Sequence, residues 1–319
     1  MNCINNELIR ILKLETPPKK NTVSLLMDII PIGKEAAYRR LRGEIPFTLE
    51  EATLICRRLN LSMDILMGTN PDDVFSFHVN TIFSNRPVEG YYKMISQILG
   101  ATDCMRRDEN CSALRAYRVI PQEFLFKYDS LSRINIYILF YQLYLQSTPK
   151  ELTEIEISKD LFNMQHKLAV AMHSIDNTTI ILDKKVFVDY IEMVKYFQSL
   201  GMIDEKQVDE IKRDLLSLLD DIEKCASSGL SFNKKKMDIY VCHISFDCTY
   251  TFIECSDIMA SSVGIYCVDH LSCTNPDICR QHKQWIKSLI RFSSLISVSG
   301  ELLRNEFFHN QRQYVNAML

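Results

Sequence analysis

The chain has 319 residues but only nine glycines, and it lacks a long apolar run. It has no glycine-rich loop of the kind that cradles phosphates, so a nucleotide site has little support. No apolar run approaches the ~18 residues that a membrane helix needs, and the first fifteen residues carry charges where a signal peptide has its apolar core. We therefore expect a cytoplasmic protein with no membrane segment.

Cysteine pairs at metal-binding spacing are also missing, although the chain has 11 cysteines. An odd count at irregular intervals does not indicate a disulfide framework. Zinc sites usually contain cysteines two to four residues apart, and no such pair occurs between 242 and 279, where cysteines are frequent. We expect these cysteines to be reduced and buried, with no metal and no cofactor. The alternative, a thiol- or metal-responsive switch, would use Cys267, Cys273, Cys279 and His270.

The remaining composition is that of a globular protein, with 47% hydrophobic and 24% charged residues. A length of 319 residues predicts at least two domains, which we divide into residues 1–69 and 70–319. The net charge of −3 argues against a chain that coats nucleic acid. The first 70 residues nevertheless have ten basic against eight acidic side chains, a local charge of +2.

Local signals predict a succession of short helices between residues 21 and 68. Apolar residues from Val23 to Ile30 are spaced for a helix that must end at Pro31. A second helix follows over 34–42 and ends at Gly43, which suits a left-handed cap position. Thr48 and the carboxylates after it predict a third helix through residue 59. We expect a last helix to begin at Ser62.

This stretch resembles the helix-turn-helix of phage repressors, the Cro-like or XRE family. The resemblance rests on Arg42-Gly43 after the second helix, on the helix over 49–59 and on the closing turn at 61–66. Unlike the usual family pattern, position 40 is Arg rather than an aliphatic residue. The family implies a four- to five-helix domain that binds double-stranded DNA.

The resemblance also implies which side chains contact DNA. The base-reading residues would be Lys34, Glu35, Tyr38, Arg39 and Arg42, on one face of the second helix. The phosphate-contacting residues would be Lys19, Lys20, Asn21, Thr22 and Arg40, with Thr22 as the cap of the first helix.

The remainder of the chain is expected to be mainly α-helical, in an α+β arrangement. Helical periodicity predicts helices over 91–104, 132–145, 152–173, 186–200, 204–225, 277–292 and 300–315. Residues 113–120 and 178–182 are candidates for isolated strands. Alternation at 238–246, 249–254 and 261–269 predicts a small antiparallel sheet near residues 238–268.

Two further patterns each have two interpretations. The apolar stripe from Val208 to Ile222 fits either core packing or a homodimer seam. The charged helix around His309 fits a solvated face better than an acid–base site. We therefore do not expect an enzyme.

Taken together, the sequence predicts a bacterial-type transcriptional regulator. Its second domain would form a homodimer and sense an unidentified small-molecule or protein effector. The alternative is a protein-interaction module whose helix-turn-helix no longer binds DNA.

Overall fold

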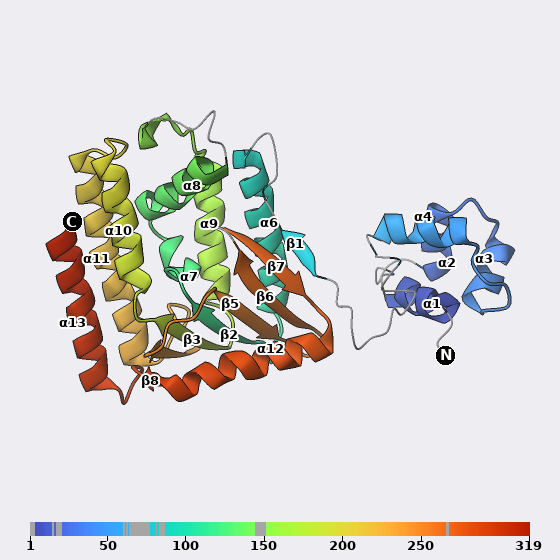
Figure 1. Cartoon of the computed structure of the whole chain (residues 1–319). Coiled ribbons are helices and arrows are strands. Elements are labelled where there is room, and N and C mark those ends of the chain that lie inside the picture. Colours follow the sequence, from blue (N-terminus) through green and yellow to red (C-terminus); the bar gives the residue numbers. More distant parts are fainter. Residues whose placement is uncertain are drawn as a thin grey trace. The chain divides into compact units, whose positions relative to one another are not determined.

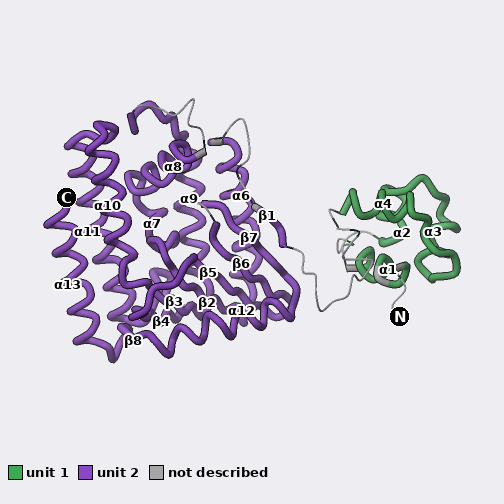
Figure 2. The backbone as a smooth tube through the Cα atoms, in the orientation of Figure 1, with its two compact units in different colours: residues 1–76 green, residues 77–319 purple. Residues whose placement is uncertain are grey.

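A computed structural model describes residues 4–14, 16, 21–59, 61, 63, 77–80, 82, 87–143, 151–265 and 268–319. Contacts divide the chain into two compact units, Met1–Ser76 and Phe77–Leu319 (Figure 2). We call them unit 1 and unit 2. The boundary expected at residues 69 and 70 lies outside the described residues.

Unit 1 is a bundle of short helices (Figure 1). They are α1 (Ile4–Leu14), α2 (Thr22–Ile29), α3 (Lys34–Leu41) and α4 (Leu49–Leu59). The three helices predicted between residues 23 and 59 are confirmed. Their apolar faces meet in one core, which contains Leu8, Leu12, Val23, Leu26, Ile30, Ala37, Ala52, Ile55 and Cys56. The expected closing turn lies largely outside the described residues.

Unit 2 is built on an eight-stranded mixed sheet with the order β1-β7-β6-β5-β2-β3-β4-β8. The strands are β1 (His78–Asn80), β2 (Ser112–Tyr117), β3 (Asn177–Asp183), β4 (Lys236–Cys242), β5 (Tyr250–Glu254), β6 (Met259–Ile265), β7 (Asp269–Cys273) and β8 (Ser293–Leu295). The neighbours β2, β3 and β4 run parallel, and every other pairing is antiparallel.

Helices connect the parallel strands and cover the sheet (Figure 1). The α-helices are α6 (Pro87–Met105), α7 (Gln122–Leu125), α8 (Asp129–Leu143), α9 (Lys159–Met172), α10 (Val186–Ser199), α11 (Glu205–Ser228), α12 (Pro276–Leu289) and α13 (Glu301–Met318). Short 3-10 turns lie at Leu152–Glu154 and Ile290–Phe292. Most helices share one core on one sheet face, whereas α12 packs on the other face against Leu114, Ala116 and Ile181. No helix among these residues has the length and apolarity needed to span a membrane.

The expectation of a small antiparallel sheet was wrong. The sheet has eight strands, and β2 and β3, expected to be isolated, lie in its centre. Parallel strands are buried on both faces, so their sequences do not alternate and their partners lie far along the chain. The strands predicted at 238–246, 249–254 and 261–269 correspond to β4, β5 and β6, of which β5 and β6 are antiparallel neighbours and β4 pairs in parallel with β3. The single helix expected over 152–173 is also divided, because Ser158 caps a new helix through a bond from the Leu161 amide (3.2 Å).

The apolar stripe of α11 lies inside the core of unit 2, as the packing interpretation predicted. A homodimer would therefore need another surface. The face of α13 with His309 is exposed, as expected, whereas the other side of the helix packs against α11, where Arg312 bonds Asp220 (2.6 Å) and Glu223. Arg304 is buried and donates to the carbonyl oxygen of Ile296 (3.0 Å).

A buried ion pair joins β2 to α7. The Arg115 guanidinium donates to Glu123 at 3.0 Å, and these side chains are 2% and 0% exposed. The Tyr117 hydroxyl donates to the other oxygen of the same carboxylate. The ring of His173 at the end of α9 donates to the Glu123 carbonyl oxygen at 3.2 Å. Burial lowers the pKa of His173, so the ring is neutral at pH 7.

Replacing Glu123 by Gln should destabilise unit 2. The substitution removes the negative partner of a buried guanidinium, which typically costs about 3–5 kcal/mol. Trp285, the only tryptophan, lies in α12 with its ring 4.3 Å from that of Tyr250, so its fluorescence reports unfolding of unit 2 alone. Urea unfolding should show a lower midpoint for Glu123→Gln and no change for the exposed control Glu156→Gln. Equal midpoints for the two variants would contradict this account.

Candidate functional site

Helices α2 and α3 with the turn between them form the candidate site. The Asn21 side chain accepts a hydrogen bond from the Val23 amide (3.0 Å), so Asn21 is the N-cap of α2. This corrects the expectation for Thr22, whose hydroxyl accepts a bond from Thr16 (3.0 Å). The helix stops at Ile29, before Pro31, because a residue that precedes proline is driven out of the helical region.

The end of α3 is fixed by backbone geometry. Gly43 adopts a φ of 75°, the left-handed conformation that glycine tolerates best. The amide of Gly43 donates to the Arg40 carbonyl (2.9 Å) and that of Glu44 to the Arg39 carbonyl (2.9 Å). These two bonds form a Schellman motif. The motif turns the chain so that Glu44 lies beside the last turn of α3.

The side chains expected to read bases share the outward face of α3. Exposed residues on this face are Lys34, Glu35, Tyr38, Arg39 and Arg42. On the opposite side Ala37 is completely buried against α2 and α4. The structure therefore brings these five side chains together, and we call them, with Glu44, the α3 face.

Glu44 partly neutralises the α3 face. Its carboxylate lies 2.8 Å from Arg42 Nε and 3.5 Å from Arg39 Nε. All three side chains are about half exposed, so these ion pairs are weak and solvent-screened. The sequence analysis missed Glu44, although its position directly after the Arg42-Gly43 cap is a recognisable signal.

Arg40 is engaged inside unit 1. Its guanidinium makes two bonds to Glu51 of α4, at 2.9 and 2.7 Å, and both side chains are about 85% buried. Glu51 also closes a capping box with Thr48, whose amide donates to it at 2.8 Å. This pair explains why position 40 differs from the aliphatic residue of the family pattern. Arg40 thus positions α3 against α4, whereas the expected phosphate ligands Lys19 and Lys20 lie outside the described residues.

The pairing of Glu51 predicts how unit 1 responds to acid. Burial alone would raise the pKa of Glu51, but the Arg40 guanidinium and the Thr48 amide hold it below its usual 4.5. A lowered folded-state pKa gives stability that is present above the unfolded value and lost as pH falls through the folded value.

Amide hydrogen exchange of peptides within 34–59, corrected for intrinsic rates, should therefore show protection that falls below about pH 4.5. Glu51→Gln should remove this pH dependence and lower protection at pH 7, while the exposed control Glu50→Gln should behave like the parent. If Glu51→Gln retained the full pH dependence, another group would be responsible.

Residues 3–87 match the BetR domain. This domain is associated with DNA-binding regulators of the helix-turn-helix type. The match covers α1 to α4 and ends where α6 begins, so it includes the whole α3 face. No curated protein and no solved structure matches the chain. The BetR match supports a regulatory DNA-binding role for unit 1.

Among the described residues there is no group of three or more histidine, cysteine or acidic side chains that would hold a metal ion. Of the proposed switch, Cys267 is not described, and Cys279 is buried with its thiol 3.4 Å from the Cys273 carbonyl. The sequence analysis missed another sulfur pair, Cys111 and Cys255, whose sulfurs lie 2.8 Å apart. Burial, with a smaller effect of Cys255, raises the pKa of Cys111 to about 12, which leaves little reactive thiolate.

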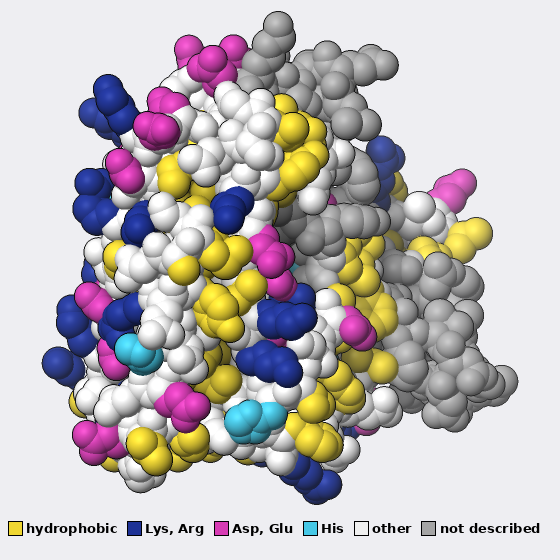
Figure 3. Space-filling model, turned by 60° about the vertical axis from the view of Figure 1, so that its left-hand side comes forward, with side chains coloured by type: hydrophobic (Ala, Val, Ile, Leu, Met, Phe, Trp, Pro, Cys, Tyr) yellow, Lys and Arg dark blue, Asp and Glu magenta, His cyan; other side chains and the backbone are white. Residues whose placement is uncertain are grey.

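The charges of unit 2 differ in arrangement from those of the α3 face. Figure 3 views the side on which α10, α11 and α13 lie, where basic and acidic side chains are interspersed. The described atoms on this side form no field of one sign, which is the pattern of an ordinary solvated surface.

Proposed function

We propose that the chain is a sequence-specific DNA-binding transcriptional regulator of the phage-repressor type, in which α3 enters the major groove. The observation that carries this proposal is the α3 face, where Tyr38, Arg39 and Arg42 are exposed together on the second helix of a helix-turn-helix. The BetR match over the same residues supports it.

The chemistry of the α3 face suits base recognition. An arginine fork can pair with the O6 and N7 atoms of guanine, which discriminates against other bases by about 1–3 kcal/mol per good pair. Lys34 and Glu35 at the start of α3 are the other candidate base-reading residues. Phosphate contacts would come from Lys19, Lys20, Asn21 and Thr22, near the N-terminus of α2, where backbone amides and the helix dipole favour an anion.

Unit 2 would supply regulation. One helix-turn-helix reads one half-site, and a homodimer brings two of them to half-sites about 34 Å apart. We propose that unit 2 forms this dimer and responds to an effector, in a cytoplasmic protein with no catalytic role. The alternative is a protein-interaction module that does not bind DNA; it is favoured by the ion pairs of Glu44, which occupy two basic groups of the α3 face.

Neutralising Arg39 and Arg42 should abolish specific binding. DNA selected from a random library by the full-length protein provides the ligand, and fluorescence anisotropy measures its Kd over a range of salt concentrations. The loss of one guanine contact corresponds to about 10- to 100-fold weaker binding. We expect at least this loss for Arg39→Ala and for Arg42→Ala, with no change for the exposed control Arg107→Ala of unit 2. A full-length protein that selects no DNA at low salt would favour the interaction module.

Removing the charge of Glu44 should have the opposite effect. Phosphate or a base edge must displace Glu44 from Arg39 and Arg42, and breaking an exposed ion pair costs about 0.2–1 kcal/mol. Glu44→Gln should therefore bind the selected DNA about two- to fivefold more tightly. Glu50→Gln makes the same change of net charge away from the α3 face and controls for long-range electrostatics. Equal affinities of the two variants would mean that Glu44 does not compete with DNA.

A further inference from the structure

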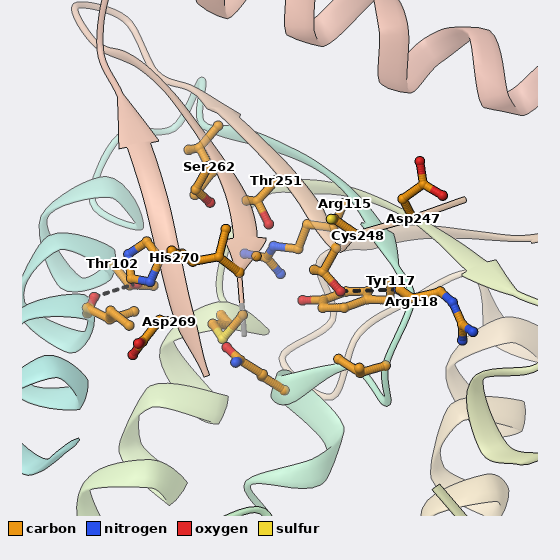
Figure 4. Close-up of a pocket in the computed structure, with 18 residues that line it drawn as sticks. Thr102, Arg115, Tyr117, Arg118, Asp247, Cys248, Thr251, Ser262, Asp269 and His270 are labelled. Atoms are coloured by element: carbon orange, nitrogen blue, oxygen red, sulfur yellow. Dashed lines mark hydrogen bonds between the residues drawn. The ribbon is translucent and has the colours of Figure 1, made fainter. Parts of the chain in front are cut away.

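Unit 2 contains a cavity of about 590 Å³ at the carboxyl end of β2 (Figure 4). Its floor is the sheet face formed by β2, β5, β6 and β7, and its walls include Ile98 and Thr102 of α6 and Met172 of α9. Small-molecule sites in proteins typically measure about 300–1,000 Å³. The cavity is therefore large enough for a metabolite.

The cavity floor is polar at a place where a sheet under helices is normally apolar. Arg115 on β2 pairs across the sheet with Thr251 on β5, which in turn pairs with Ser262 on β6. Figure 4 shows these three side chains at the cavity. In the same row, β3 carries Ile180, which is fully buried in the core. Polar groups withdrawn from water are costly unless they find partners, so this polar row indicates a polar occupant.

The centre of the floor offers an unused donor. One terminal guanidinium nitrogen of Arg115 donates to Glu123. The buried Nε of Arg115 has no hydrogen-bond acceptor among the described residues. The acidic groups of the lining lie at its edges. Asp247 is exposed, and Asp269 accepts the Ile82 amide (3.2 Å). The carboxylate of Glu123, which already pairs with Arg115, does not line the cavity. An acceptor on the ligand could thus reach the unpaired Nε from the cavity side.

We propose that this cavity binds a small hydroxy carboxylic acid. Its carboxylate would accept from Arg115, in a charge-assisted bond of the kind that is stronger than bonds between neutral groups. Its hydroxyl groups would exchange hydrogen bonds with Thr251 and Ser262. A neutral polyol lacks the negative charge that would pair with Arg115. An acid without hydroxyl groups would leave the hydroxyls of Thr251 and Ser262 unpaired, which lowers its affinity for a polar site.

Thermal unfolding of the full-length protein tests this proposal, with Trp285 fluorescence as the readout for unit 2. The probes are malate, citrate and gluconate, with glucose as the neutral comparison. A ligand that binds only the folded protein raises Tm in proportion to the logarithm of its concentration above Kd. At least one of the three acids should raise Tm in this way, and glucose should not.

The variants Thr251→Val and Ser262→Ala locate the binding. Each removes one floor hydroxyl and keeps most of the volume, and the loss of a hydrogen bond worth about 1 kcal/mol corresponds to about fivefold weaker binding. Thr274→Val changes an exposed threonine outside the cavity and should bind like the parent. The affinity of a variant is interpreted only if its Trp285 emission without ligand matches that of the parent, which shows that unit 2 is folded. Ser262→Ala is the smaller change, and its affinity is sufficient to test the proposal if Thr251→Val does not fold. The proposal is overturned if no acid raises Tm, if glucose raises it equally, or if the floor variants retain parental affinity.

Discussion

The ion pair between Arg115 and Glu123 is the constraint on which unit 2 depends most. A buried guanidinium is tolerated only beside a charge partner, and the partner here lies eight residues along the chain, on α7. The pair therefore fixes the turn that follows β2. Because Tyr117 and His173 bond the same glutamate, strand β2, helix α7 and the end of α9 are held around one charge pair. Because Arg115 also lines the cavity, the same ion pair holds part of the cavity floor in place.

In unit 1, too, a largely buried ion pair holds two elements together. Arg40 and Glu51 hold α3 against α4, and Gly43 sets the direction in which the chain leaves α3. The arginines of α3 thus have separate roles. Arg40 is largely buried in its pair with Glu51, whereas Arg39 and Arg42 remain exposed and share the solvent-screened charge of Glu44. Glu44 acts as a counterion for these two arginines, and an anionic ligand must displace it before binding them. This requirement disfavours weakly binding anions.

The sequence predicted unit 1 better than unit 2 because the signals of unit 1 are local. Pro31, Gly43 and Thr48 each act on the residues beside them, and the helices end where these residues indicate. Strands β2 and β3 carry no alternation, and their register depends on partners 59 or more residues away along the chain. The buried ion pair of Arg115 could not be predicted either, since the sequence of a strand does not reveal which of its polar residues is buried. Glu44 and Arg40 show a further limit: the pattern identified an exposed basic helix but not the carboxylates that pair with it.

The strand pair β1–β7 lies beside the cavity. Strand β1 lies at the edge of the described sheet and pairs there with β7 along His78–Asn80, with Asn80 opposite His270. His270 and its neighbour Asp269 line the cavity, and Asp269 also holds the Ile82 amide. Residues 78–80 and 82 are therefore held beside the cavity wall, near the start of unit 2. A three-residue edge strand has few backbone bonds to lose, so its pairing is the element of unit 2 that a change in β7 would shift most easily. The proposed ligand cavity and the first strand of unit 2 therefore share the β1–β7 pair, so a ligand that shifted β7 would act on the pairing of β1.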